Sequence, residues 1–142
     1  MSETLQTPVL SVHDLKKHFP IKSGVFGKVV GHVKAVNGVS FDIAAGETFG
    51  LVGESGCGKS TTGQVILRLL SPTSGSVHYN GEDVFTANDQ RLRKLRKEMQ
   101  VVFQDPYSAL NPRMTVGAAI REILQVHGMA SGAAAQKKVG EV

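Results

Sequence analysis

The sequence contains one cysteine and no long apolar run, and each absence excludes a class of protein. A single cysteine, Cys57, cannot build an internal disulfide framework, which suits a reducing cytoplasm. No run of about 18 apolar residues could span a bilayer, and residues 1–10 have no basic segment followed by an apolar one, as a secretory signal requires. We therefore expect any membrane association to come through a partner protein.

The composition also lacks the bias of a disordered or fibrous chain, since 41% of the 142 residues are hydrophobic and 20% are charged. The formal net charge of +4 is compatible with a polyphosphate, a nucleic acid or an anionic membrane surface, and decides among none of them. Arg91, Lys94 and Lys97 form a basic run on a predicted helix, without interleaved aromatic residues that could stack on bases. We interpret this run as a solvated helix face and expect no direct nucleic-acid partner. A nucleic-acid-dependent ATPase is the alternative.

Residues 53–61 read G-E-S-G-C-G-K-S-T and match the pattern G-x-x-x-x-G-K-[ST] of phosphate-binding loops. The glycines allow backbone conformations that turn several amides onto a phosphate. Lys59 is expected to reach the β- and γ-phosphates of ATP, and the Ser60 hydroxyl to coordinate Mg²⁺. The residues predicted to bind nucleotide here are Gly53, Glu54, Ser55, Gly56, Cys57, Gly58, Lys59, Ser60 and Thr61, with Thr61 at the α-phosphate and the Cys57 thiol as a small filler.

The flanking segments support a phosphate loop. Residues 48–52 (T-F-G-L-V) predict a short strand before the loop. The apolar residues after Lys59 fall on one helical face, namely Val65, Ile66, Leu69 and Leu70. A helix that begins at the lysine would point its dipole at the anion. The alternative, a glycine-rich turn that fits the pattern by chance, is weaker because both flanking signals are present.

The first 45 residues predict an antiparallel β layer. Residues 9–19 suggest a strand that Phe19 and Pro20 end, and the glycine- and lysine-rich residues 21–32 suggest a long loop. Residues 33–43 suggest a second strand, in which apolar and polar side chains alternate, and Asn37–Gly38 suggest a turn.

Beyond the loop helix, residues 71–75 are a breaker cluster, and Asn80–Gly81 predict the turn of a small hairpin. Asn88 is expected to cap a helix whose apolar face holds Leu92, Leu95 and Met99. Residues 101–103 predict a buried strand that ends at Gln104, where α/β folds place ligands.

Another helix is expected to end at Gly128, and Ser131 to cap a last one. We interpret His127 as a packed residue at a helix end rather than a metal ligand, because no second ligand stands at suitable spacing.

Three segments together resemble the ATPase subunits of ABC transporters, in particular those of bacterial oligopeptide, dipeptide or nickel importers. They are the phosphate loop, the stretch A-V-N-G-V-S-F-D-I-A-A-G-E from Ala35, and the stretch F-Q-D-P-Y-S-A-L-N-P-R-M-T-V from Phe103. The resemblance runs from Val9 to the last residue. It implies an α/β fold, namely a P-loop NTPase core of the ABC ATPase type with an N-terminal antiparallel β layer and the start of an α-helical subdomain. Residues 1–142 would form part of one ABC ATPase domain: the β layer (1–45), the P-loop core (46–104), and the Q-loop with the start of the helical subdomain (105–142).

The resemblance also implies roles for two further residues. Gln104 would be the Q-loop glutamine, a catalytic residue that contacts Mg²⁺ and the attacking water. Phe19 falls where the family carries an aromatic ring that stacks on adenine, a role its flat apolar face could fill. A place in the core is the equal alternative for Phe19.

Family members are longer, and this sequence has no L-S-G-G-Q signature and no apolar strand that ends in an Asp-Glu pair. We therefore expect an incomplete domain that is not an efficient ATPase alone. The implied function is the ATP-binding subunit of a peptide importer, which couples ATP hydrolysis to uptake. It would be a cytoplasmic protein held at the inner face of the membrane by transmembrane permease subunits, and it would pair with a second ATPase subunit. The alternative is a nucleotide-binding remnant or regulatory module that does not hydrolyse ATP.

Overall fold

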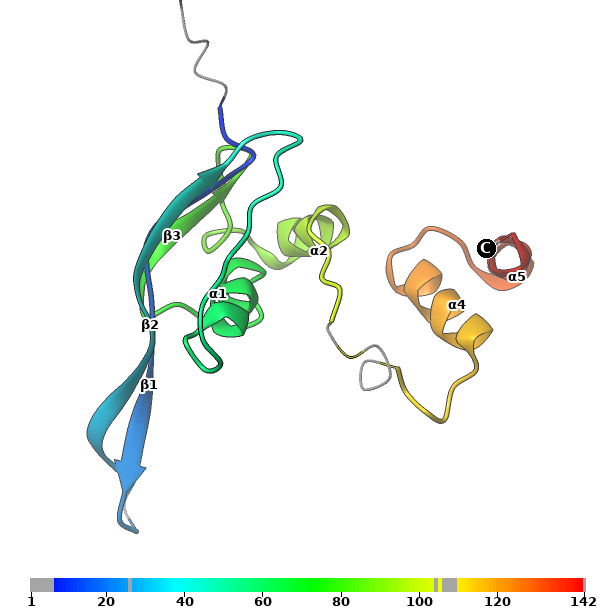
Figure 1. Cartoon of the computed structure of the whole chain (residues 1–142). Coiled ribbons are helices and arrows are strands. Elements are labelled where there is room, and N and C mark those ends of the chain that lie inside the picture. Colours follow the sequence, from blue (N-terminus) through cyan, green and yellow to red (C-terminus); the bar gives the residue numbers. More distant parts are fainter. Residues whose placement is uncertain (1–6, 26, 104, 106–109, 142) are drawn as a thin grey trace, which may run out of the picture. The chain divides into compact units, whose positions relative to one another are not determined.

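The computed structural model describes residues 7–25, 27–103, 105 and 110–141 (Figure 1). It divides into two compact units, Met1–Leu92 and Arg93–Val142. The predicted division of the chain at residues 45 and 104 stays a prediction.

The described part of the first unit contains an antiparallel sheet with the strand order β2-β1-β3-β4. The strands are β1 (Leu10–Ser23), β2 (Lys28–Ile43), β3 (Ser74–Tyr79) and β4 (Glu82–Asp83). The predicted alternation along β2 is confirmed, because Ser40 and Asp42 are exposed while their neighbours Val39, Phe41 and Ile43 are half-buried.

One helix of the first unit, α1 (Lys59–Ile66), contacts β1 and β2. Thr62 and Val65 of α1 are buried, as are apolar side chains from three strands and from the segment after β4: Val12, Leu15, Val36, Val77 and Val84. This core is small, and it fixes the start of α1 relative to β2.

Helix α2 (Asp89–Glu98) begins in the first unit and ends in the second, which also contains α4 (Val116–Val126) and α5 (Gly132–Gly140). The predicted cap of α2 is confirmed, because the Arg91 amide donates to Asn88 Oδ1 at 2.9 Å. Helix α4 ends at Val126, and Gly128, the predicted end, follows the C-cap residue His127. The His127 carbonyl accepts a hydrogen bond from Lys97 Nζ. Ser131 precedes α5 as predicted, but its side chain makes no capping hydrogen bond.

The prediction of a long loop over residues 21–32 was wrong. β1 continues through Pro20, which pairs with His32, and the two strands form a hairpin whose last ladder pair is Ser23 and Lys28. Pro20 is tolerated because β3 pairs with β1 only as far as Lys16, and the His18 amide donates to Thr73 Oγ1 just beyond it. From Pro20 onwards β1 has an open edge that needs no amide donor. The predicted turn at Asn37–Gly38 was also wrong. Gly38 is an extra residue within β2 with φ of 90°, as in a β-bulge.

Helix α1 begins at Lys59 as predicted but ends at Ile66, before the apolar residues Leu69 and Leu70 that were assigned to its face. The Arg68 amide donates to the Val65 carbonyl, and the Leu69 amide donates to the Gln64 carbonyl. With Arg68 at φ of 52°, these bonds form a Schellman motif that ends the helix. Leu69 is consequently half exposed.

Two predicted strands, residues 48–52 and 101–103, are not formed. Neither segment pairs with another strand in the part of the chain that the structure describes, and a strand without a ladder partner is not stable. Val52 and Val102 are 89% and 95% exposed.

Within the described residues, no helix has both the length and the apolar character needed to cross a bilayer.

Candidate phosphate-binding site

The side chain of Lys59 folds back over the loop that precedes it. Its Nζ donates hydrogen bonds of 2.7 Å to the carbonyls of Gly53 and Glu54, and lies 3.4 Å from Cys57 Sγ. The ammonium group thus stands inside the curve of residues 53–58. A phosphate in this loop would meet a fixed positive charge.

The loop enters α1 through Gly58, which has φ of 99°. A Cβ added to Gly58 would lie 2.1 Å from the Ala35 carbonyl oxygen of β2, so only glycine fits between the loop and this strand. Ala35 is itself an extra residue in the ladder, because Lys17 pairs with Val36 while the next residue, His18, pairs with Lys34. The β-bulge at Ala35 therefore provides the support on which the phosphate loop ends.

The first turn of α1 presents the features of an anion site. The Thr62 amide donates to the Gly58 carbonyl at 2.8 Å, and no side chain caps the amides that precede it. Uncapped first-turn amides and the helix dipole both favour negative charge at this end. A cavity of about 140 Å³ opens at the same place, lined by Ala35, Gly56, Gly58, Lys59, Ser60 and Thr61.

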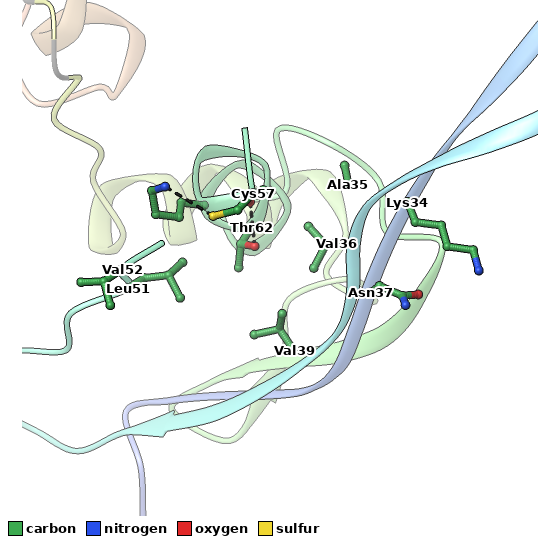
Figure 2. Close-up of a pocket in the computed structure, with 11 residues that line it drawn as sticks. Lys34, Ala35, Val36, Asn37, Val39, Leu51, Val52, Cys57 and Thr62 are labelled. Carbon is green, nitrogen blue, oxygen red and sulfur yellow. Dashed lines mark hydrogen bonds between the residues drawn. The ribbon is translucent and has the colours of Figure 1, made fainter. Parts of the chain in front are cut away.

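A second cavity of about 240 Å³ lies between the loop and β2 (Figure 2). Val36 and Val39 point into it from β2, Leu51 lies opposite them, and Cys57 and Thr62 close it on the helix side, whereas the Lys34 side chain points away. Its lining is largely apolar, so the polar cavity at the start of α1 is the better place for phosphate.

Ser60 is exposed at the start of α1, where its hydroxyl is available to a cation. Among the described residues, no three His, Cys, Asp or Glu side chains gather that could hold a metal ion. A single serine hydroxyl suits Mg²⁺ bound with a nucleotide. Mg²⁺ keeps several waters and takes few protein ligands when phosphate oxygens supply the rest.

Cys57 is exposed and its Sγ fills the space beside Gly53, where an added Cβ would lie 2.7 Å from the sulfur. The interpretation of the thiol as a filler stays a prediction.

Phe19 is 37% exposed on β1 and does not belong to the core. It pairs with Val33 of β2, two positions along that strand from the Ala35 bulge, and Lys17 Nζ lies 4.9 Å from the centre of its ring. Phe19 and Lys17 share one face of β1 because they are two residues apart. The structure thus leaves an exposed ring on β1, opposite the part of β2 that leads to Ala35.

Gln104 lies outside the described residues, so its predicted role stays a prediction. Sequence reasoning missed Ala35, since a bulge has no signature in an alternating strand pattern. Gly38, which we had interpreted as part of a turn, was the nearest signal of irregular pairing in β2.

Comparisons with known proteins identify the family of the chain. The family model described as ABC transporter matches residues 36–141. The oligopeptide transport ATP-binding protein AppF of Bacillus subtilis is 47% identical over 143 residues, which cover 100% of this chain and 44% of that protein. The glutathione import ATP-binding protein GsiA of Escherichia coli K12 is 47% identical over 132 residues, which cover 93% of this chain and 21% of that protein.

A solved structure of the ATP-binding cassette MJ0796, dimeric and bound to ADP and Pi, superimposes with a TM-score of 0.71 at 27% identity. That match covers 93% of this chain and 54% of the cassette. This chain therefore spans less than half the length of the two curated relatives. The predicted ABC ATPase fold is confirmed, and the chain belongs to the ABC transporter family, in which it is similar to the ATP-binding subunits of importers.

Proposed function

We propose that residues 53–61 bind the phosphates of ATP together with Mg²⁺. The observation that carries this proposal is the position of Lys59 Nζ, 2.7 Å from two loop carbonyls and inside the curve of the loop. The uncapped start of α1 adds amide donors and a favourable dipole. In this assignment Lys59 contacts the β- and γ-phosphates, Ser60 ligates Mg²⁺ and Thr61 contacts the α-phosphate.

Two residues complete the proposed site. The Phe19 ring stacks on adenine, which is supported by its exposure and by its place near the Ala35 bulge. Gln104 contacts Mg²⁺ and the attacking water, and this assignment rests on the family resemblance alone.

The wider function is ATP binding in an importer. AppF and GsiA bear names for oligopeptide transport and glutathione import, and we extend peptide uptake to the protein that carries this sequence. In that role it pairs with a second ATPase subunit on the cytoplasmic side of the membrane, against transmembrane permease subunits. The 142 residues themselves bind nucleotide without efficient turnover, because the sequence has neither L-S-G-G-Q nor an Asp-Glu pair after an apolar strand. The second candidate is a nucleotide-binding remnant or regulatory module.

The test is ligand-induced stabilisation. ATP with Mg²⁺ at about one hundred times its dissociation constant should add about 2.7 kcal/mol to the free energy of unfolding, which thermal unfolding measures. Lys59→Ala should abolish most of this gain. The control Lys137→Ala removes an exposed lysine of α5 and should leave it unchanged.

If Lys59→Ala is stabilised by ATP as strongly as the wild-type chain, the phosphate loop is assigned wrongly. Phosphate release separates the two candidate functions, provided that it is measured on the protein encoded by the longest reading frame that contains this sequence. Hydrolysis there supports the importer subunit, and stabilisation without hydrolysis supports the non-hydrolysing module.

A further inference from the structure

The hairpin formed by β1 and β2 extends beyond the rest of its sheet (Figure 1). We call residues 20–32, apart from residue 26, the hairpin arm. β3 pairs with β1 only between Leu10 and Lys16, so the arm has no third strand beside it. A two-stranded ribbon is marginally stable in water by itself, and the arm therefore gains from a surface that covers it.

The arm exposes apolar side chains on both strands. Val25 at the turn is 100% exposed and Val30 is 61% exposed, while Ile21 and Val29 are each 46% exposed. These side chains cluster around the turn rather than next to the small core. They form an apolar tip that the described residues do not cover.

The charge of the surrounding segment has one sign. Residues 17–41 contain four lysines and no aspartate or glutamate, whereas Lys16, just before them, pairs with Asp14. Lys22 and Lys28 flank the turn, where Lys22 pairs across the ladder with Val29 and Lys28 pairs with Ser23. Neither lysine has a carboxylate partner among the described residues. Cationic side chains thus stand directly behind an apolar tip.

The sequence alone led us to expect membrane association only through a partner protein, but the exposed arm supports a direct contact. We propose that the hairpin arm binds the surface of a membrane that contains anionic phospholipid. The Val25 tip enters the boundary between headgroups and acyl chains, and Lys22 and Lys28 remain at the level of the phosphates. Charge complementarity favours this occupant, because a lysine segment without carboxylates matches a continuous negative surface. A lipid interface also accepts a narrow tip, whereas a specific protein interface requires a larger area. The proposal does not depend on nucleotide binding.

The first test is partition onto vesicles, measured by co-sedimentation. The chain should bind vesicles that contain phosphatidylglycerol and not vesicles of phosphatidylcholine alone, and about 1 M salt should weaken the binding because it shortens the screening length to about 3 Å. The double variant Lys22→Glu/Lys28→Glu should bind about 25-fold more weakly or worse, since each lysine near such a surface contributes about a fivefold gain. The control Lys137→Glu/Lys138→Glu makes the same change of charge on α5 and should bind like the wild-type chain.

The second test does not rely on a loss of binding. The chain has no tryptophan, so the variant V25W carries a single fluorescent probe at the tip. Its emission should shift to the blue on anionic vesicles and be quenched by brominated acyl chains. The same probe in V126W, on the exposed side of α4, should do neither.

Equal binding to both kinds of vesicle, an equal loss in the α5 control, or no spectral change in V25W would each overturn the proposal. Weaker association of the arm variant with permease subunits, while its vesicle binding is unchanged, would overturn it in favour of an acidic protein surface.

Discussion

At Gly58, the absence of one methyl group lets the phosphate loop lie against β2. An alanine there would hold a positive φ at a cost of about 1–2 kcal/mol, and its Cβ would meet the Ala35 carbonyl oxygen at 2.1 Å. Gly56 also has a positive φ, but a Cβ there meets nothing within 4 Å. We expect Gly58→Ala to destabilise the chain by about 2 kcal/mol or more and to abolish ATP-induced stabilisation.

The matched control is Gly56→Ala, which carries the cost of the positive φ without the contact. Urea unfolding followed by circular dichroism measures both variants. Equal losses of stability would mean that the contact between Gly58 and the Ala35 carbonyl does not support the loop.

The residues of the loop could be predicted because the pattern and its chemistry are local. Lys59 and Gly58 are next to one another in sequence, and the backbone conformations that they require follow from the loop pattern alone. Ala35 could not be predicted in the same way, because its contact arises from a register shift between strands.

At the scale of elements, α2 depends on the cap at Asn88. The Arg91 amide donates to Asn88 Oδ1 at 2.9 Å, and the Leu92 amide donates to the Asn88 carbonyl at 2.8 Å. Asn88→Ala removes the first of these bonds and should reduce the free energy of unfolding by about 1 kcal/mol.

Asn88→Asp keeps an acceptor at the same position and should retain most of the stability. Thermal unfolding of the two variants compares them directly. A loss of similar size in Asn88→Asp would show that the capping bond contributes little.

Elements with local signals were predicted well, and the others were not. The hairpin between β3 and β4 turns at Asn80 and Gly81. Both residues have positive φ, which a two-residue hairpin turn requires and an Asn-Gly pair tolerates. The end of α1 was missed, because the left-handed residue of its Schellman motif is Arg68 rather than glycine. The extension of β1 was missed because Pro20 is unfavourable in a strand unless that strand has an open edge.

At the scale of the whole molecule, the sequence pattern predicted strands that require partners. The apolar triplet at residues 101–103 is typical of a strand in the middle of a parallel sheet, and such a strand is stabilised by ladders on both sides. In the part of the chain that the structure describes, those ladders are absent, and Phe103 is 51% exposed. Pattern alone cannot tell whether the neighbouring strands are available.

An exposed apolar segment without a ladder partner is prone to pair with other copies of the chain. Val102 is 95% exposed, so Val102→Asp removes little burial and should change the free energy of unfolding by less than about 0.5 kcal/mol. The added charge should nevertheless reduce self-association, measured by light scattering over a range of concentrations. The control Val116→Asp places the same charge on an exposed residue of α4 and should leave self-association unchanged. If the two variants lower it equally, net charge rather than the unpaired segment governs association of the chain.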